Sequence, residues 1–136
     1  MQVAISRKLA EGLEDAFKRN ILNDAVLKCI DDHLDAMPEK WPVWRTELRK
    51  NGRPKLEVLR NCPEGVPPPM FSLYIPPCEP LEGTIFMNHG LRILVYISKE
   101  HIIVVYDIGD HTYSCRQCGK VYNGVYNAVD KGGKKK

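Results

Sequence analysis

No stretch of this sequence is apolar for long enough to cross a membrane, since nowhere do about 18 uncharged apolar residues follow one another. The first twenty residues mix charged and apolar side chains, which is not the pattern of a secretory signal peptide. These two absences disfavour the membrane and secreted classes of protein. We therefore expect an intracellular protein of the cytoplasm or nucleus, without a membrane partner.

Cysteine is too scarce for a disulfide framework, and its number is odd. The chain has five cysteines among 136 residues, so full pairing would leave one thiol over. An odd number of cysteines needs no explanation if the protein is in a reducing compartment, where the thiols stay reduced and some of them bind zinc. The His-Glu-x-x-His motif of zinc proteases is also missing, and neither His33 nor His101 has a nearby nucleophile in the sequence. Whether the protein is an enzyme stays uncertain, and enzymes are the least favoured class.

What is present suffices for one compact domain, because 43% of the 136 residues are hydrophobic. The pattern along the chain divides it into four parts. These are a helical half (1–60), a proline-rich connection (61–80), an antiparallel β half with a Cys-x-x-Cys motif (81–129) and a basic tail (130–136). The lysine-rich tail is either native or a remnant of cloning.

The helical half begins with an amphipathic helix. Apolar residues recur every four positions from Ile5 to Phe17, with charged residues on the opposite face. We expect this helix to end at Asn20 and to pack as a hairpin with the helix that follows.

The second helix is expected to start with Asn23 or Asp24 as its N-cap. It should stop at Pro38, since proline lacks the amide proton that a helix interior uses. A proline after Trp41 then suits the first turn of a short third helix, which carries Trp44 and ends at Asn51-Gly52.

Strands are expected after the helices. Seven of the ten prolines lie between residues 62 and 81, where only Met70–Ile75 can form a short edge strand. Beyond Gly83, residues 84–87, Leu91–Ile97 and 102–106 are rich in β-branched and aromatic side chains and are separated by short turns. An antiparallel meander is the predicted arrangement.

A Cys-x-x-Cys-Gly segment flanked by tyrosines is the strongest motif in the chain. Cys115 and Cys118 supply two thiolates on one turn, which is half of the tetrahedral set that a structural Zn²⁺ requires. His111 is the nearest further ligand in sequence. If residues 98–101 form a turn with Ile97 facing Ile102, the same pairing brings His89 close to His111.

A second ligand set competes with the histidines. Cys62 and Cys78 lie in proline-stiffened loops and could complete a four-thiolate site, similar to a zinc ribbon opened by a long insertion. The cofactor predicted is Zn²⁺ in either case, and the choice between the two sets stays open.

Charge changes sign near residue 40. Residues 24–39 hold five acidic side chains against Lys28, whereas residues 40–60 hold seven basic side chains against two glutamates. The basic segment also contains both tryptophans, a mixture suited to phosphate contacts and base stacking. The residues we expect to bind nucleic acid are Trp41, Trp44, Arg45, Arg49, Lys50 and Arg53. The competing interpretation places both tryptophans in the core and leaves the basic side chains as an ordinary solvated face.

Together these features predict an α+β fold: an N-terminal helical hairpin plus a short third helix, followed by a small antiparallel β-sheet with a C-terminal zinc knuckle. We expect a small zinc-stabilised regulatory protein, of the kind found among viral accessory and host proteins, that binds RNA or DNA. The alternative is a protein-interaction adaptor or self-associating regulator. In that case the acidic helix or the sheet edge would bind another protein or a second copy of the chain.

Overall fold

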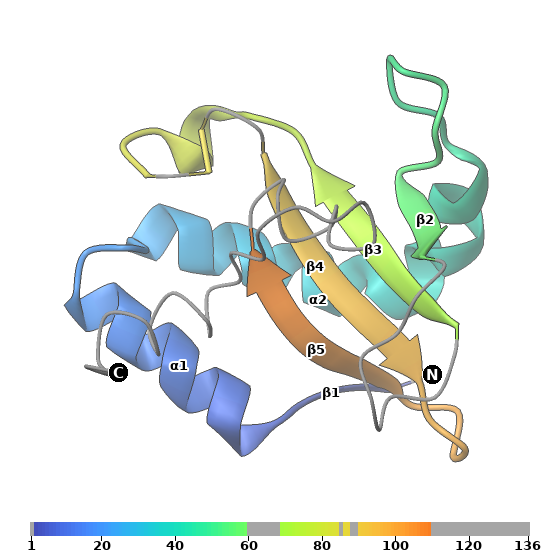
Figure 1. Cartoon of the computed structure of the whole chain (residues 1–136), viewed down its shortest axis with the longest axis horizontal. Coiled ribbons are helices and arrows are strands. Elements are labelled where there is room, and N and C mark those ends of the chain that lie inside the picture. The colour runs from blue at the N-terminus through green and yellow to red at the C-terminus, as the bar shows by residue number, and fades with distance from the viewer. Residues whose placement is uncertain (1, 60–68, 85, 88–89, 110–136) are drawn as a thin grey trace.

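Two helices lie against a five-stranded mixed β-sheet in the described part of the chain, which comprises residues 2–59, 69–84, 86–87 and 90–109 of a computed structural model (Figure 1). The elements in chain order are β1 Val3–Ile5, α1 Arg7–Lys18, α2 Asp24–Thr46, β2 Leu56–Leu59, β3 Met70–Ile75, the 3₁₀ turn η1 Glu79–Leu81, β4 Leu91–Ile97 and β5 Ile103–Gly109. The α+β class is therefore confirmed. Neither of the described helices has the length and apolar character needed to span a membrane.

Helix α1 starts later than the apolar spacing suggested. The side chain of Ser6 caps it by accepting a hydrogen bond of 3.0 Å from the Leu9 amide. Ile5 therefore precedes the helix and belongs to β1, and its expected place on the helical stripe was wrong. The helix ends as predicted: Asn20 adopts φ 65°, and the Ile21 amide bonds back to Ala16, which is the Schellman arrangement.

Helix α2 continues through both of its prolines. The Asn23 side chain caps it by accepting from the Val26 amide, as one of our two alternatives stated. The predicted stop at Pro38 was wrong, because the helix runs on through Pro42 to Thr46. The expected third helix is thus the last part of α2.

Burial explains why α2 tolerates the prolines. A proline inside a helix costs about 3 kcal/mol, since its ring meets the preceding turn and a backbone hydrogen bond is lost. Continuing the helix beyond Pro38 buries Trp44 and packs Trp41 against the same core. Burial of each large apolar side chain contributes about 1.5–3 kcal/mol, which is comparable with the cost of the prolines.

The sheet has the strand order β1-β5-β4-β3-β2. β1 pairs with β5 in parallel and the other neighbours are antiparallel, so the expectation of a purely antiparallel sheet was wrong. β3 was predicted at its observed bounds but as an edge strand, and instead it lies between β2 and β4. β1 and β2 were not predicted at all. Both come from the half of the chain expected to be helical, so the sheet joins the two halves.

The turn before β5 is one residue longer than expected. The Ser98 amide bonds to the Ile102 carbonyl, the Ser98 hydroxyl accepts from two amides within the turn, and His101 adopts φ 62°. Ile97 therefore pairs with Ile103 and not with Ile102, and a bulge at Leu94/Val95 shifts the pairing again. Because side chains alternate between the two faces, the shift by one residue places residues 103–105 on the faces opposite to those predicted, and the second shift at the bulge restores the predicted faces beyond it.

The expected strand at residues 84–87 is absent from the part of it that the structure describes. Thr84, Phe86 and Met87 lie in turns, and the Thr84 hydroxyl donates to the Leu81 carbonyl at 2.7 Å. Phe86 is fully buried, so this segment adds an apolar side chain to the core without joining the sheet.

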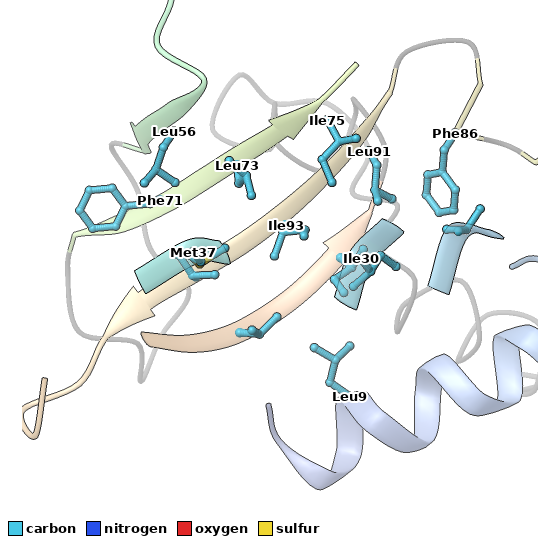
Figure 2. Close-up of a cluster of buried hydrophobic side chains, with 14 of the residues drawn as sticks. Leu9, Ile30, Met37, Leu56, Phe71, Leu73, Ile75, Phe86, Leu91 and Ile93 are labelled. Carbon is cyan, nitrogen blue, oxygen red and sulfur yellow. The ribbon is translucent and has the colours of Figure 1, made fainter. Parts of the chain in front are cut away.

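The main core lies between the helices and one face of the sheet (Figure 2). Alternate residues of β3 and β4, among them Leu73 and Ile93, meet Leu9 of α1 and Ile30 and Met37 of α2. α2 contacts both β1 and β2 and so crosses the sheet from one edge strand to the other. The opposite face carries a smaller buried cluster of Leu59, Met70 and Leu94, against which Tyr106 packs.

Candidate anion-binding site

Most of the predicted zinc ligands lie outside the described residues. These are Cys62, His89, His111, Cys115 and Cys118. Within residues 2–59, 69–84, 86–87 and 90–109, no three His, Cys, Asp or Glu side chains are grouped so that they could hold a metal ion. The zinc knuckle therefore stays a hypothesis that rests on the Cys-x-x-Cys motif.

Cys78 is the one zinc candidate that the structure places. It is half-buried where η1 begins, and it interacts with Cys29 of α2, which is half-buried as well. Burial raises the pKa of the Cys29 thiol above 9.0, and the neighbouring Cys78 and Asp32 raise it further. Cys29 is therefore a protonated thiol at neutral pH and not an activated nucleophile.

Both tryptophans of the basic segment contribute to the core. Trp44 is 8% exposed, and Trp41 meets the Phe71 ring edge-on with 4.9 Å between the ring centres. Such contacts stabilise the fold and occupy the aromatic faces that a base would need. Their position matches the competing interpretation given above.

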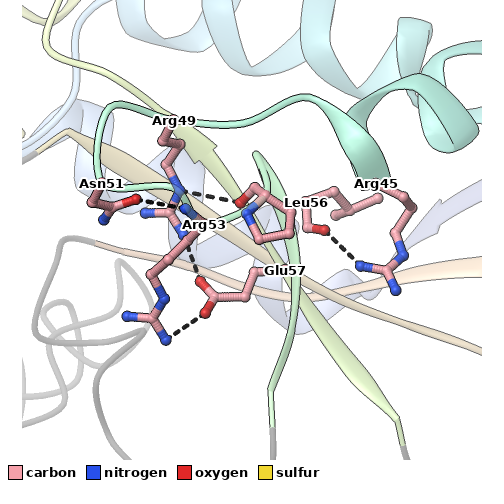
Figure 3. Close-up of polar contacts among 7 residues, drawn as sticks. Arg45, Arg49, Asn51, Arg53, Leu56 and Glu57 are labelled. Carbon is pink, nitrogen blue, oxygen red and sulfur yellow. Dashed lines mark hydrogen bonds and ion pairs between the residues drawn. The ribbon is translucent and has the colours of Figure 1, made fainter.

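All three arginines predicted to bind nucleic acid make bonds within the protein (Figure 3). Arg45 donates to the Leu56 carbonyl at 2.9 Å, which ties the end of α2 to β2. Arg49 donates to the Pro54 carbonyl at 3.1 Å and forms an ion pair with Glu57, whose carboxylate also pairs with Arg53. Arg53 and Lys50 are exposed to solvent, so their charges are accessible to a ligand.

A tight hairpin joins α2 to β2 and presents these charges. The Arg49 amide bonds to the Arg53 carbonyl at 2.8 Å, and the Lys55 amide bonds to the Glu47 carbonyl at 2.7 Å. Gly52 adopts φ 84°, a conformation that glycine reaches without strain. Asn51-Gly52, expected to end a helix, therefore forms the tip of this hairpin.

The hairpin and the ends of two central strands enclose a pocket of about 660 Å³. One side consists of hairpin residues 47–51 and Lys55, and the other consists of Tyr74, Pro76 and Pro77 at the end of β3 and Arg92 at the start of β4. The backbone bond from the Tyr74 amide to the Lys55 carbonyl, 2.9 Å long, holds the two sides together. We call this hollow the basic pocket.

Tyr74 is fixed within the basic pocket by cations. The guanidinium carbons of Arg49 and Arg92 lie 4.8 and 4.3 Å from its ring centre. Gly90 lies close by, since a Cβ there would be 2.5 Å from the Ile75 carbonyl oxygen and 3.0 Å from the Tyr74 ring. The close approach of the β4 entry to β3 thus depends on a residue without a side chain.

Lys55 lines the same pocket, and its ammonium is 6.0 Å from the Trp44 ring centre. Burial lowers the pKa of this ammonium from its ordinary value of 10.5, and the nearby Glu47 carboxylate partly opposes the change. Lys55 therefore holds a positive charge with reduced hydration. An anion that enters the pocket would restore part of the lost solvation.

Sequence analysis found part of this site. Arg49 and Lys50 were among the predicted residues, whereas Lys55, Tyr74 and Arg92 were not. Arg92 did leave a signal, because a lone arginine in the apolar run Leu91–Ile97 is unusual unless the charge has a role. Comparison with protein-family models, with curated proteins and with solved structures finds no match for this chain.

Proposed function

We propose that this protein binds single-stranded RNA or DNA through phosphate contacts at the hairpin between α2 and β2. The observation that carries the proposal is the basic pocket, where cationic side chains from the hairpin and from β4 converge beside an aromatic ring. Basic side chains on a fixed, concave surface attract the nucleic-acid backbone and release its bound counterions.

The described contacts divide the six predicted residues into two roles. Trp41, Trp44 and Arg45 hold the end of α2 against the sheet. Lys50 and Arg53 are the exposed cations that reach phosphate, while Arg49 lines the pocket and orients Tyr74. Alanine substitution of Arg45 or Arg49 would remove bonds that hold α2 and the hairpin in place. Lys50 and the largely exposed Arg53, which would lose only its ion pair with Glu57, are the better reporters of binding.

The salt dependence of oligonucleotide binding tests the proposal. Two phosphate contacts on a single strand, one each from Lys50 and Arg53, predict an affinity loss of about sevenfold between roughly 50 and 200 mM salt. Lys50→Ala combined with Arg53→Ala should weaken binding at least about tenfold at low salt. The matched control, Lys18→Ala with Lys99→Ala, removes two exposed charges elsewhere and should keep the affinity within about twofold.

Fluorescence anisotropy with a labelled single strand measures both effects. If no oligonucleotide is retained at low salt, nucleic-acid binding is rejected. If the control variant loses as much affinity as the hairpin variant, the attraction belongs to net charge and not to this surface.

Zinc at Cys115 and Cys118 is the second part of the proposal, and the Cys-x-x-Cys-Gly motif supports it. Cys78 packs with Cys29 against the core, so we favour His111 and His89 over Cys62 and Cys78 as the remaining ligands. Elemental analysis of untagged protein should find about one zinc per chain. Cys115→Ser should lower the zinc content and the melting temperature together, and a zinc content near zero in the wild type would refute the site.

A protein-interaction adaptor remains the second candidate, and one observation favours it. The five acidic residues of α2 are all exposed, and β2 is an edge strand among the described ones, with Val58 42% exposed. An open edge can pair with a second copy of the chain. Sedimentation equilibrium distinguishes the two candidates, because Val58→Lys should abolish a dimer that forms along this edge and leave oligonucleotide affinity unchanged.

A further inference from the structure

The basic pocket has a charge surplus that its own carboxylates do not neutralise. Its lining carries Arg49, Lys50 and Lys55 against the single carboxylate of Glu47, even when Arg92 is left out. Glu57 is already shared between Arg49 and Arg53. A ligand that fits this pocket must therefore bring negative charge.

The pocket is also a hollow and not a flat strip of charge. Its lining comes from the hairpin, the end of β3 and the start of β4, and its volume of about 660 Å³ suits one nucleotide. An internal part of a nucleic-acid strand can pass over the exposed cations Lys50 and Arg53. The end of a strand can enter the hollow and reach Lys55 and Tyr74 as well.

The two kinds of phosphate in a nucleic acid differ in charge. A phosphate monoester at a strand end carries about −1.5 to −2 at pH 7 and offers three acceptor oxygens. An internal diester carries one negative charge. The half-buried ammonium of Lys55 gains more from the monoester, because charge-assisted hydrogen bonds strengthen where water is reduced.

We propose that the basic pocket binds the terminal phosphate monoester of a single-stranded nucleic acid or of a free nucleotide, with Lys50 and Lys55 contacting the phosphate. Arg49 and Arg92 hold Tyr74 as the wall of the pocket. This inference rests on the proposed nucleic-acid binding and adds a preference for strand ends to it.

Short single strands of one sequence, bearing a 5′-phosphate, a 3′-phosphate or no terminal phosphate, provide the test. Fluorescence anisotropy at fixed salt should give at least one phosphorylated form about tenfold tighter binding than the unphosphorylated strand. Competition with adenosine monophosphate and with inorganic phosphate separates the sources of the monoester. Competition by the nucleotide alone shows that the sugar and base contribute, and competition by both shows that the phosphate suffices.

Substitutions of lysines test whether the preference for a terminal phosphate arises in the basic pocket. Lys55→Met and Lys50→Met should each reduce the tenfold preference to below about threefold. Lys99→Met should keep it, because Lys99 lies in the turn that follows the end of β4, whereas Arg92 of the pocket is at the start of that strand. Circular dichroism and thermal melting check the fold of each variant. Lys50 is exposed, so its variant remains informative if Lys55→Met does not fold.

Each outcome decides a different claim. Equal affinity for all three strands overturns the terminal-phosphate inference and leaves backbone binding intact. Binding of the phosphorylated strands alone supports the inference and rejects backbone binding. Absence of binding by every strand and by the nucleotide overturns both.

Discussion

Arg49 and Glu57 form an ion pair across the hairpin, and their side chains are only 13% and 16% exposed. The same carboxylate also pairs with Arg53, so one acidic residue restrains two cations of the nucleic-acid surface. Glu57 therefore stabilises the fold, but it also reduces the positive charge that is available to a ligand.

Glu57→Gln should separate those two demands. Removing one partner of a mostly buried pair leaves Arg49 without its counter-charge, which should lower the free energy of unfolding by about 2 kcal/mol. The released positive charge should at the same time raise oligonucleotide affinity by a few fold. Urea denaturation and fluorescence anisotropy measure the two effects. Glu100→Gln, an exposed change in the β4–β5 turn, is the control, and parallel loss of stability and affinity in Glu57→Gln would contradict the prediction.

Gly90 and Gly52 form a matched pair of glycines, since both adopt φ 84°. At Gly52 an added Cβ meets nothing within 4 Å, so Gly52→Ala should cost only the about 1–2 kcal/mol of a left-handed alanine. At Gly90 the Cβ would lie 2.5 Å from a backbone oxygen of Ile75, so Gly90→Ala should cost at least about 2 kcal/mol more. Urea denaturation of the two variants gives the difference. Equal destabilisation would show that β3 and β4 can separate here without cost.

Helix α2 tolerates Pro38, but the proline does not stabilise the helix. Pro38→Ala restores an amide that can donate to the Leu34 carbonyl, and it removes the ring from the preceding turn. Against this gain stands the greater freedom of the unfolded alanine chain, about 0.4–1 kcal/mol. We expect a net stabilisation of about 1 kcal/mol or more, measured by thermal and urea unfolding. A destabilised Pro38→Ala would mean that the ring itself packs favourably against its neighbours.

The lowered pKa of Lys55 predicts how stability changes with alkaline pH. The unfolded chain keeps a proton on this lysine up to about pH 10.5, whereas the folded protein releases it earlier. The unfolded state thus binds more protons between the lowered pKa and 10.5, and Lys55 adds stability as pH rises through that window. The stability of the wild type relative to Lys55→Met should therefore increase as pH rises through this window toward 10.5.

The titration of Cys29 also changes stability in this pH range, so its contribution must be separated from that of Lys55. Burial raises its pKa above 9.0, so the folded protein retains this proton longer and Cys29 lowers stability as pH rises above 9.0. The thiol also interacts with Lys55, so both proteins should carry Cys29→Ala. Urea denaturation across the pH range then isolates Lys55. Lys99→Met should show no such trend relative to wild type, and a constant difference for Lys55→Met would contradict the assignment.

The sequence predicted those elements whose formation depends on the conformational preferences of neighbouring residues. β4 was placed at its observed bounds because β-branched residues fill it, and the cap at Asn23 and the end of α1 at Asn20 follow from side-chain and backbone preferences. Pro38 misled the prediction because its cost is local, whereas the burial of Trp44 and the packing of Trp41 that offset it depend on the sheet.

The candidate site was harder to predict for a related reason. Arg49 and Tyr74 are 25 positions apart, and their contact depends on the α2–β2 hairpin pairing with β3. The register of β4 and β5 depends on a serine that bonds within its own turn, a detail that hydrophobic alternation does not contain. The high number of basic residues in the segment 40–60 predicted the surface. The pocket could not be predicted, because it forms only where the hairpin meets β3 and β4 in the tertiary structure.

The parallel pairing of β1 with β5 has a consequence for how the protein is made. Val3 is synthesised about a hundred residues before its partner Ile103, so β1 cannot dock until the segment between them has been synthesised. Until then β1 has no partner strand, and its unpaired backbone groups can pair with a neighbouring nascent chain. The Ile103 amide proton, which bonds to Gln2 at 2.8 Å, should accordingly be among the last to resist exchange in pulse-labelled refolding.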